Sequence, residues 1–118
     1  MDENKLQVTT DKTLGTPVIT ANGDIDIYSV AGFKSSINEL LDTGVNELII
    51  DLKGVEYVDS SGFGALLGAT KRVRPNGGKI ILAGCSESVA RVMKITQLDT
   101  IFDIYKDREQ AVDSIKVH

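Results

Sequence analysis

Histidine, cysteine and tryptophan are almost missing from this chain. It has one His, which is the last residue (His118), one Cys (Cys85) and no Trp. His and Cys side chains supply most general acid–base catalysis, the base of Ser-His-Asp triads and the usual zinc sites. A single Cys also excludes an internal disulfide and fits a reducing cytoplasm. The composition therefore favours a binding or switching module over an enzyme, with no cofactor and no metal.

Basic charge and long apolar runs are also scarce. The 118 residues carry 13 Lys and Arg against 17 Asp and Glu, a net charge of −4, and the sequence pI is about 4.9. Nucleic-acid binders need clustered cations to displace phosphate counterions, so we expect no nucleic-acid partner. No apolar run approaches the about 20 residues of a membrane span, and Met1-Asp2-Glu3-Asn4 is the reverse of a secretory signal. We expect a cytoplasmic protein without a membrane partner.

The overall amino-acid composition is that of an ordinary globular protein. Apolar residues make up 42% and charged residues 25%, and a chain of this length forms one domain, so we expect a single unit over residues 1–118. Alternating or continuous apolar stretches predict strands, and apolar residues three and four apart predict helices. The predicted strands are at about 4–10, 18–21, 48–52, 80–83 and 101–105, and the predicted helices at 30–41, 63–73, 89–96 and 111–115.

The order of these elements predicts the fold class. Gly15 between the first two strands indicates a hairpin, Ser29 and Asp107 are candidate helix N-caps, and Gly44 is a candidate helix stop. The resulting order is β-β-α-β-α-β-α-β-α. This alternation predicts an α/β domain with a mixed, mainly parallel sheet and about four helices packed on it.

Asp59-Ser60-Ser61-Gly62, between an apolar strand end and a helix, is the most informative stretch. Asp and Ser oxygens accept hydrogen bonds from the free N–H groups of a helix start, so helix capping is one interpretation. Capping needs only one such residue, but this stretch has an Asp and two serines. Gly62 and Gly64 follow them, and each glycine destabilises a helix by about 1 kcal/mol relative to Ala. Those glycines suggest that another surface or backbone comes close.

A phosphorylation switch is the second interpretation of the same stretch. A phosphate on a serine here adds about −1.5 to −2 charges, which the positive end of a helix dipole tolerates. A partner packed over this turn then meets a desolvated charge without a counter-ion, at a cost of several kcal/mol. Asp24 and Asp26 either turn the chain into the first helix or join this site, depending on whether they lie near Ser60.

Other motifs point to no chemistry. The glycines of 62–68 miss the dinucleotide-binding spacing by one residue, and the chain has no phosphate-binding P-loop. Asp51 lacks the acidic pair after the first strand that a phosphoacceptor Asp requires, so we expect it to form a turn with Lys53-Gly54. A hydrolase nucleophile at Ser60 or Ser61 has no internal His as its base. We expect Cys85 to pack as a small apolar residue.

The sequence resembles the STAS-domain anti-sigma factor antagonists of bacteria. The resemblance covers nearly the whole chain and rests on the segments 23–26, 59–64, 77–79 and 95–102. It implies partner switching, in which the unphosphorylated antagonist binds an anti-sigma factor that is also a serine kinase and so frees a sigma factor. It also implies that this kinase phosphorylates Ser60, directly after the Asp of the box, and that a metal-dependent serine phosphatase reverses the step.

The resemblance further implies roles for the residues around Ser60. Asp59 helps to position the phosphoacceptor, and Asp24 and Asp26 belong to the binding surface. Val58 stands where the family often has Met, and Phe63 where it usually has Leu; if Phe63 is exposed, it changes which kinase fits. The partner-binding or supporting residues implied are Asp24, Asp26, Asp59, Ser61, Gly62 and Phe63.

Two rival functions stay open at this point. The turn at 62–68 could hold the phosphate of a nucleotide or a lipid. Alternatively, the same fold could serve as a STAS module of a stressosome or of a transport-associated complex.

Overall fold

The computed structural model of the chain describes residues 6–116, and the side chains of residues 6–115. Residues 1–5, 117 and 118, which include the predicted start of the first strand and His118, lie outside the described residues. The predicted element order is confirmed. The strands are β1 (Gln7–Thr13), β2 (Thr16–Asn22), β3 (Glu47–Gly54), β4 (Lys79–Ala83) and β5 (Asp103–Tyr105), and the α-helices are α1 (Val30–Asp42), α2 (Ser60–Val73), α3 (Glu87–Ile95) and α4 (Arg108–Lys116).

The strands of the described chain form one five-stranded sheet in the order β1-β2-β3-β4-β5. β1 and β2 pair antiparallel, and all the following pairs are parallel. The predicted mixed, mainly parallel sheet is therefore confirmed. Because β2, β3 and β4 run in the same direction, their carboxyl ends meet at one edge of the sheet, which brings the loops before α1, α2 and α3 together.

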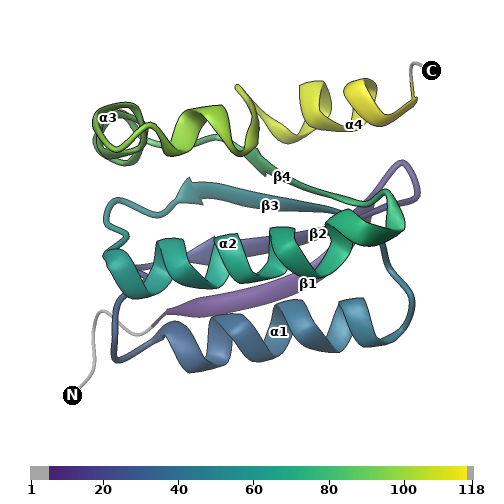
Figure 1. Cartoon of the computed structure of the whole chain (residues 1–118), viewed down its shortest axis with the longest axis horizontal. Coiled ribbons are helices and arrows are strands. Elements are labelled where there is room, and N and C mark those ends of the chain that lie inside the picture. Colours follow the sequence, from purple (N-terminus) through teal and green to yellow (C-terminus); the bar gives the residue numbers. More distant parts are fainter. Residues whose placement is uncertain (1–5, 117–118) are drawn as a thin grey trace.

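The two faces of the sheet bury separate apolar clusters. Successive strand residues point to opposite faces, so Leu48 and Ile50 join the cluster under α1, α2 and α3, whereas Ile49 joins the cluster under α4. Figure 1 shows α1 and α2 running side by side, with α4 on the other side of the strands. β3 and β4 are thus covered on both faces, which explains their nearly continuous apolar sequences.

The first helix begins and ends where the sequence predicts, but not by the predicted capping bond. α1 buries Phe33, Ile37 and Leu41, one residue per turn, against the sheet. Ser29 occupies the N-cap position, yet its side chain makes no capping bond to the helix. Gly44 follows the C-cap with a φ of +98°, a left-handed conformation that glycine adopts without strain.

The hairpin turn between β1 and β2 consists of Leu14 and Gly15. Both residues have positive φ, 50° and 85°. A two-residue turn in which both residues have positive φ matches the twist of the flanking strands, and Asn-Gly is the preferred pair at its two positions. Leu14 is therefore an unfavourable residue at its position, and its side chain is exposed.

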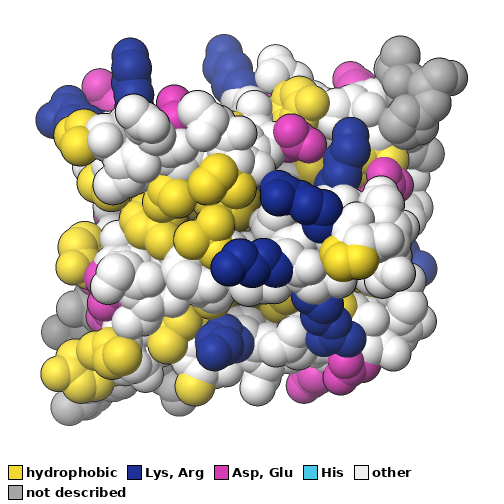
Figure 2. All heavy atoms as spheres, in the orientation of Figure 1, with side chains coloured by type: hydrophobic (Ala, Val, Ile, Leu, Met, Phe, Trp, Pro, Cys, Tyr) yellow, Lys and Arg dark blue, Asp and Glu magenta, His cyan; other side chains and the backbone are white. Residues whose placement is uncertain are grey.

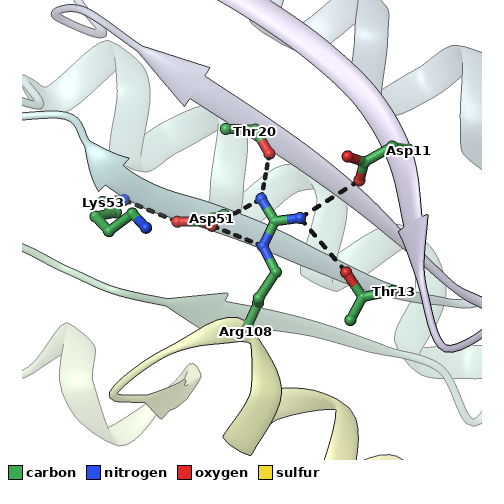
Figure 3. A network of polar contacts seen from close by, with 6 residues as sticks. All are labelled: Asp11, Thr13, Thr20, Asp51, Lys53 and Arg108. Atoms are coloured by element: carbon green, nitrogen blue, oxygen red, sulfur yellow. Dashed lines mark hydrogen bonds and ion pairs between the residues drawn. The ribbon is translucent and has the colours of Figure 1, made fainter.

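A polar network fixes α4 to the sheet (Figure 3). Arg108, at the start of α4, contacts the buried carboxylate of Asp51 through Nε at 3.0 Å and through Nη2 at 2.9 Å. Its Nη2 also donates to Thr20 Oγ1 at 2.7 Å, and its Nη1 lies 3.5 Å from Asp11. Asp51 Oδ1 accepts from the N–H of Lys53 at 2.9 Å, but the turn predicted with Lys53-Gly54 is wrong, because β3 continues to Gly54 and Asp51 pairs with Thr20 and Ala83 inside the sheet. The sequence did not predict the ion pair.

The last part of the chain departs in detail from the prediction. The predicted strand at 101–105 starts later, at Asp103, because a short 3₁₀ turn (η2, Leu98–Thr100) precedes it. Phe102 is buried in the core and Ile101 stays exposed. The predicted cap of α4 is confirmed, since Asp107 Oδ1 accepts from the N–H of Gln110 at 2.8 Å. Among the described residues, no helix has both the length and the apolar character that crossing a membrane requires.

Candidate partner-binding site

Asp59 holds the start of α2 and joins it to a neighbouring loop. Its backbone is extended, and its Oδ1 accepts a hydrogen bond from the N–H of Gly62 at 3.1 Å. The predicted N-cap is therefore confirmed. Its Oδ2 accepts a second bond from the N–H of Ile27 at 3.1 Å. One carboxylate thus links the first turn of α2 to the loop before α1.

Backbone bonds join the same two loops. The N–H of Ile25 donates to the carbonyl of Tyr57, and the N–H of Asp59 donates to the carbonyl of Ile25, both at 3.0 Å. Ile25 and Val58 form an isolated parallel bridge. The pairing of β2 with β3 therefore continues beyond the strands, and the loops act as one rigid rim around the start of α2.

Asp24 and Asp26 lie in the first of these loops. Asp26 Oδ1 accepts from the N–H groups of Tyr28, at 2.9 Å, and Ser29, at 3.1 Å, which turns the chain into α1 as expected. The hydroxyl of Ser29 donates to the carbonyl of Asp24 at 2.8 Å, and its oxygen accepts from the N–H of Asp26 at 3.0 Å. The second bond takes the place of the capping bond expected of Ser29. Since the loop is bonded to Asp59, both carboxylates belong to the rim near Ser60.

Ser60 is the first residue of α2, and its side chain is exposed. Ser61, beside it, is half-buried. The N–H groups at a helix start and the helix dipole favour an anion at this position. The geometry therefore leaves one hydroxyl accessible to a modifying enzyme, at the edge of a rim that already carries Asp24, Asp26 and Asp59.

Three large apolar side chains on this rim face solvent. Tyr28 is 93% exposed, Ile27 64% and Tyr57 54%. Single exposed apolar residues are common on protein surfaces, but three on two bonded loops form a contact area suited to a protein partner. Our sequence analysis did not single them out. They could have been recognised in the sequence, because all three are large apolar residues that lie outside the segments with strand or helix periodicity and so are not needed for the core.

Gly62 and Phe63 support the site from below. A Cβ on Gly62 would lie 2.5 Å from Val58 Cγ1 and 2.8 Å from Ile25 Cγ2, so the rim needs glycine there. The close approach that the glycines suggested is thus confirmed for Gly62, but Gly64 has open space within 4 Å of its Cβ position. Phe63 is buried in the core, so it does not offer a contact to a kinase.

The described residues show no metal-binding arrangement. They contain no group of three or more His, Cys, Asp or Glu side chains that could hold an ion. Cys85, after β4, is half-buried and packs against the core as expected. Burial raises the pKa of its thiol to about 11, more than the bond from its own backbone lowers it. The thiol is therefore protonated at neutral pH and a poor nucleophile.

Comparison with known proteins identifies the family. A model of the STAS domain matches residues 7–111. The chain belongs to the STAS domain family. The anti-sigma-B factor antagonist of Bacillus subtilis is 38% identical over 90 residues, which are 76% of this chain and 82% of that protein. The resemblance noted in the sequence is therefore confirmed, and it includes relatives that are named anti-sigma factor antagonists.

Solved structures share the fold of this STAS domain. An anti-sigma factor antagonist from Mycobacterium paratuberculosis superposes with a TM-score of 0.87 at 20% identity, over 97% of both chains. The Bacillus protein SpoIIAA, described as an anti-sigma factor antagonist, has a TM-score of 0.72 in its unphosphorylated form at 22% identity, over 95% of this chain and 100% of that one. Its phosphorylated form has a TM-score of 0.71 at 23% identity, over 92% and 99%.

Proposed function

We propose that this STAS domain is an anti-sigma factor antagonist whose binding is switched by phosphorylation of Ser60. The observation that carries the proposal is the exposed hydroxyl of Ser60 at the start of α2, within a rim of bonded loops. The name of the Bacillus subtilis relative supports the antagonist role. The existence of SpoIIAA in both phosphorylated and unphosphorylated forms supports the switch.

The proposed partner is an anti-sigma factor with serine kinase activity. It docks on the rim, with Ile27, Tyr28 and Tyr57 supplying apolar contact and Asp24 and Asp26 supplying charge. In this role the protein regulates transcription in the cytoplasm through binding and has no catalytic residue of its own. A metal-dependent serine phosphatase resets the switch by removing the phosphate.

The switch acts through charge at a surface that keeps its shape. Asp59 is itself an anion, and its two carboxylate oxygens accept bonds from the N–H groups of Gly62 and Ile27, so it adds negative charge beside a phosphate on Ser60 and no counter-ion. The helix start stabilises the added charge in solution. A partner packed over Ser60 removes water from that charge, and burying it without a counter-ion costs several kcal/mol. The modified chain therefore stays folded and releases its partner.

Binding of the kinase to variants of Ser60 tests the proposal. The kinase is purified from the source organism as the activity that phosphorylates this chain, and the modified residue is mapped by mass spectrometry. We expect Ser60→Ala to bind it as tightly as the wild type without being phosphorylated, and Ser60→Asp to bind at least about tenfold more weakly. Ser35→Asp, at an exposed serine of α1, is the control and keeps wild-type affinity.

Two results would refute the proposal. Full phosphorylation of Ser60→Ala would place the modification elsewhere. Equal affinity of the kinase for the wild type, Ser60→Asp and the phosphorylated chain would show that the charge does not control binding. Nucleotide binding to the isolated domain, or co-purification of the chain with a transport complex instead of a kinase, would favour the rival functions.

A further inference from the structure

One side of α2 carries a line of residues that begins at the proposed phosphorylation site. Leu67, Lys71 and Arg74 follow Ser60 by seven, eleven and fourteen residues. At about 100° per residue these positions lie within about 40° of Ser60 around the helix axis. The line is about 21 Å long at about 1.5 Å per residue. It leads from Ser60 to two cations at the far end of α2.

An apolar patch lies along this line. Figure 2 shows hydrophobic side chains gathered between α2 and the segment that follows α3, with Lys and Arg side chains at the border of the patch. Leu67 and Leu98 are partly buried against the core, and Ile101 is 42% exposed. Ile101 lines one hollow together with Arg74, Lys79 and Asp103, which places the chain after η2 directly beside α2.

The two cations at the end of the line make no ion pair with another residue that the structure describes. Lys71 and Arg74 are exposed, and neither forms an ion pair among the described residues. Arg72, which points to the other side of α2, contacts Asp42 at 2.6 Å and Asn38 at 3.0 Å. The ion pair of α2 therefore belongs to the α1 side of the helix. On the patch side the cations Lys71, Arg74 and Lys79 outnumber Asp103, the carboxylate that lines the hollow beside Arg74.

We propose that Leu67, Leu98, Ile101, Lys71 and Arg74 form a second docking surface, the α2 strip, for the anti-sigma kinase. The inference rests on the proposed function, because Ser60 stands at the start of the strip. The segment of the kinase that binds there has apolar side chains that contact Leu67 and Leu98, and it ends in carboxylates that contact the two cations beside Ile101. The partner thus meets acidic side chains at the rim and basic ones at the far end of α2.

The size of a stable interface favours this occupant. A specific protein complex involves about 20–30 residues on each partner, more than the twelve residues of the loops at 23–29 and 55–59. A kinase that reaches the hydroxyl of Ser60 must cover the first turn of α2, and the apolar surface continuous with that turn runs along the strip. Opposite charges at the two ends then fix the direction in which the partner lies.

Charge reversal at the far end of α2 tests the strip. The probe is the kinase purified by its phosphorylation of Ser60, and its Kd for the full chain is measured in low salt. We expect Lys71→Glu/Arg74→Glu to raise the Kd about tenfold and Lys71→Glu alone about threefold, since each reversal replaces an attraction between surface charges by a repulsion. The effect shrinks as salt screens the charges. Ile101→Ser also weakens binding.

The β1–β2 hairpin supplies matched controls. Lys12→Glu changes the net charge as Lys71→Glu does, and Leu14→Ser removes an exposed apolar side chain as Ile101→Ser does. Both controls keep the Kd of the wild type within about twofold. Unfolding by urea, compared among all variants, shows that the domain is intact. Reversal of a kinase carboxylate that hydrogen exchange maps to the contact restores binding of Lys71→Glu.

The outcomes separate this inference from the proposed function. If Ser60→Asp weakens kinase binding and the strip variants do not, the strip is refuted and the phosphorylation switch stands. If the strip variants weaken binding and Ser60→Asp does not, the strip stands and the switch is refuted. If the strip variants alter only the sedimentation of the chain by itself, the occupant is a second copy and the inference is wrong.

Discussion

The double role of Asp59 gives the sharpest test of how the site is built. Replacing Asp59 by Ala removes the N-cap bond to Gly62 and the bond to Ile27. Loss of a cap costs about 1 kcal/mol, and loss of an exposed hydrogen bond adds about 0.5 kcal/mol. We therefore expect Asp59→Ala to lower the free energy of unfolding by about 1.5 kcal/mol. With about 2.1 cal/mol/K of unfolding entropy per residue, the Tm falls by about 6 °C.

Two comparison variants divide that loss between the two bonds. Ser86 caps α3 by accepting one bond, from the N–H of Val89 at 3.2 Å, so Ser86→Ala should cost only the about 1 kcal/mol of a cap. Asp59→Asn keeps an acceptor for Gly62 but turns an amide toward Ile27, so it should cost about 0.5 kcal/mol.

Urea unfolding measures these free energies, and hydrogen exchange of the Ile27 amide reports the second bond directly. We expect this amide to exchange faster in both Asp59 variants and at the wild-type rate in Ser86→Ala. A loss below about 0.5 kcal/mol for Asp59→Ala, or an unchanged Ile27 exchange rate, would refute the argument that this carboxylate ties the two loops together.

Four further predictions follow from the packing, the turn, the ion pair and the thiol. Gly62→Ala should destabilise by about 1–2 kcal/mol in urea, whereas Gly64→Ala, with open space, should stabilise; equal effects would contradict this. Leu14→Asn should stabilise by about 1 kcal/mol, because Asn suits a positive φ. Arg108→Met should cost about 3 kcal/mol in the same assay by leaving Asp51 buried and unpaired. Burial raises the pKa of the Cys85 thiol from 9.0 to about 11, so the thiol should react with iodoacetamide slowly at pH 8 and increasingly fast up to pH 11. The contribution of this protonated thiol to the free energy of unfolding should be complete below pH 9 and lost as the pH rises through about 11. A reaction rate that levels off near pH 9 would contradict this.

Local patterns predicted the elements and the start of α2 because the relevant residues are close in sequence. Asp59 and Gly62 are three residues apart, and the apolar spacing after Gly62 already placed Phe63 on the apolar side of a helix. The same spacing explains why Phe63 is buried in the core and why the idea of an exposed Phe63 does not hold. Short-range hydrogen bonding and helix periodicity decide these features, and both can be read from one segment.

Long-range contacts could not be predicted from such patterns. Arg108 and Asp51 are 57 residues apart, and Ile27 and Asp59 are 32 apart. Each segment alone fitted a local explanation. The cap expected of Asp59 is correct but incomplete, and the turn expected of Asp51 is wrong, because the strand continues past it to Gly54. Only the strand order, which places β2 beside β3 and α4 beneath both, brings the partners together.

The continuation of strand pairing into the loops has a consequence for timing. Ile25, Val58 and Asp59 are joined by backbone hydrogen bonds. The loops that carry the hydroxyl of Ser60 are therefore already ordered before a partner binds. In the proposed switch, a partner that reaches Ser60 therefore meets the hydroxyl or the phosphate on loops that are already bonded together. The proposed kinase and phosphatase would then set the time that switching takes, because no loop has to fold first.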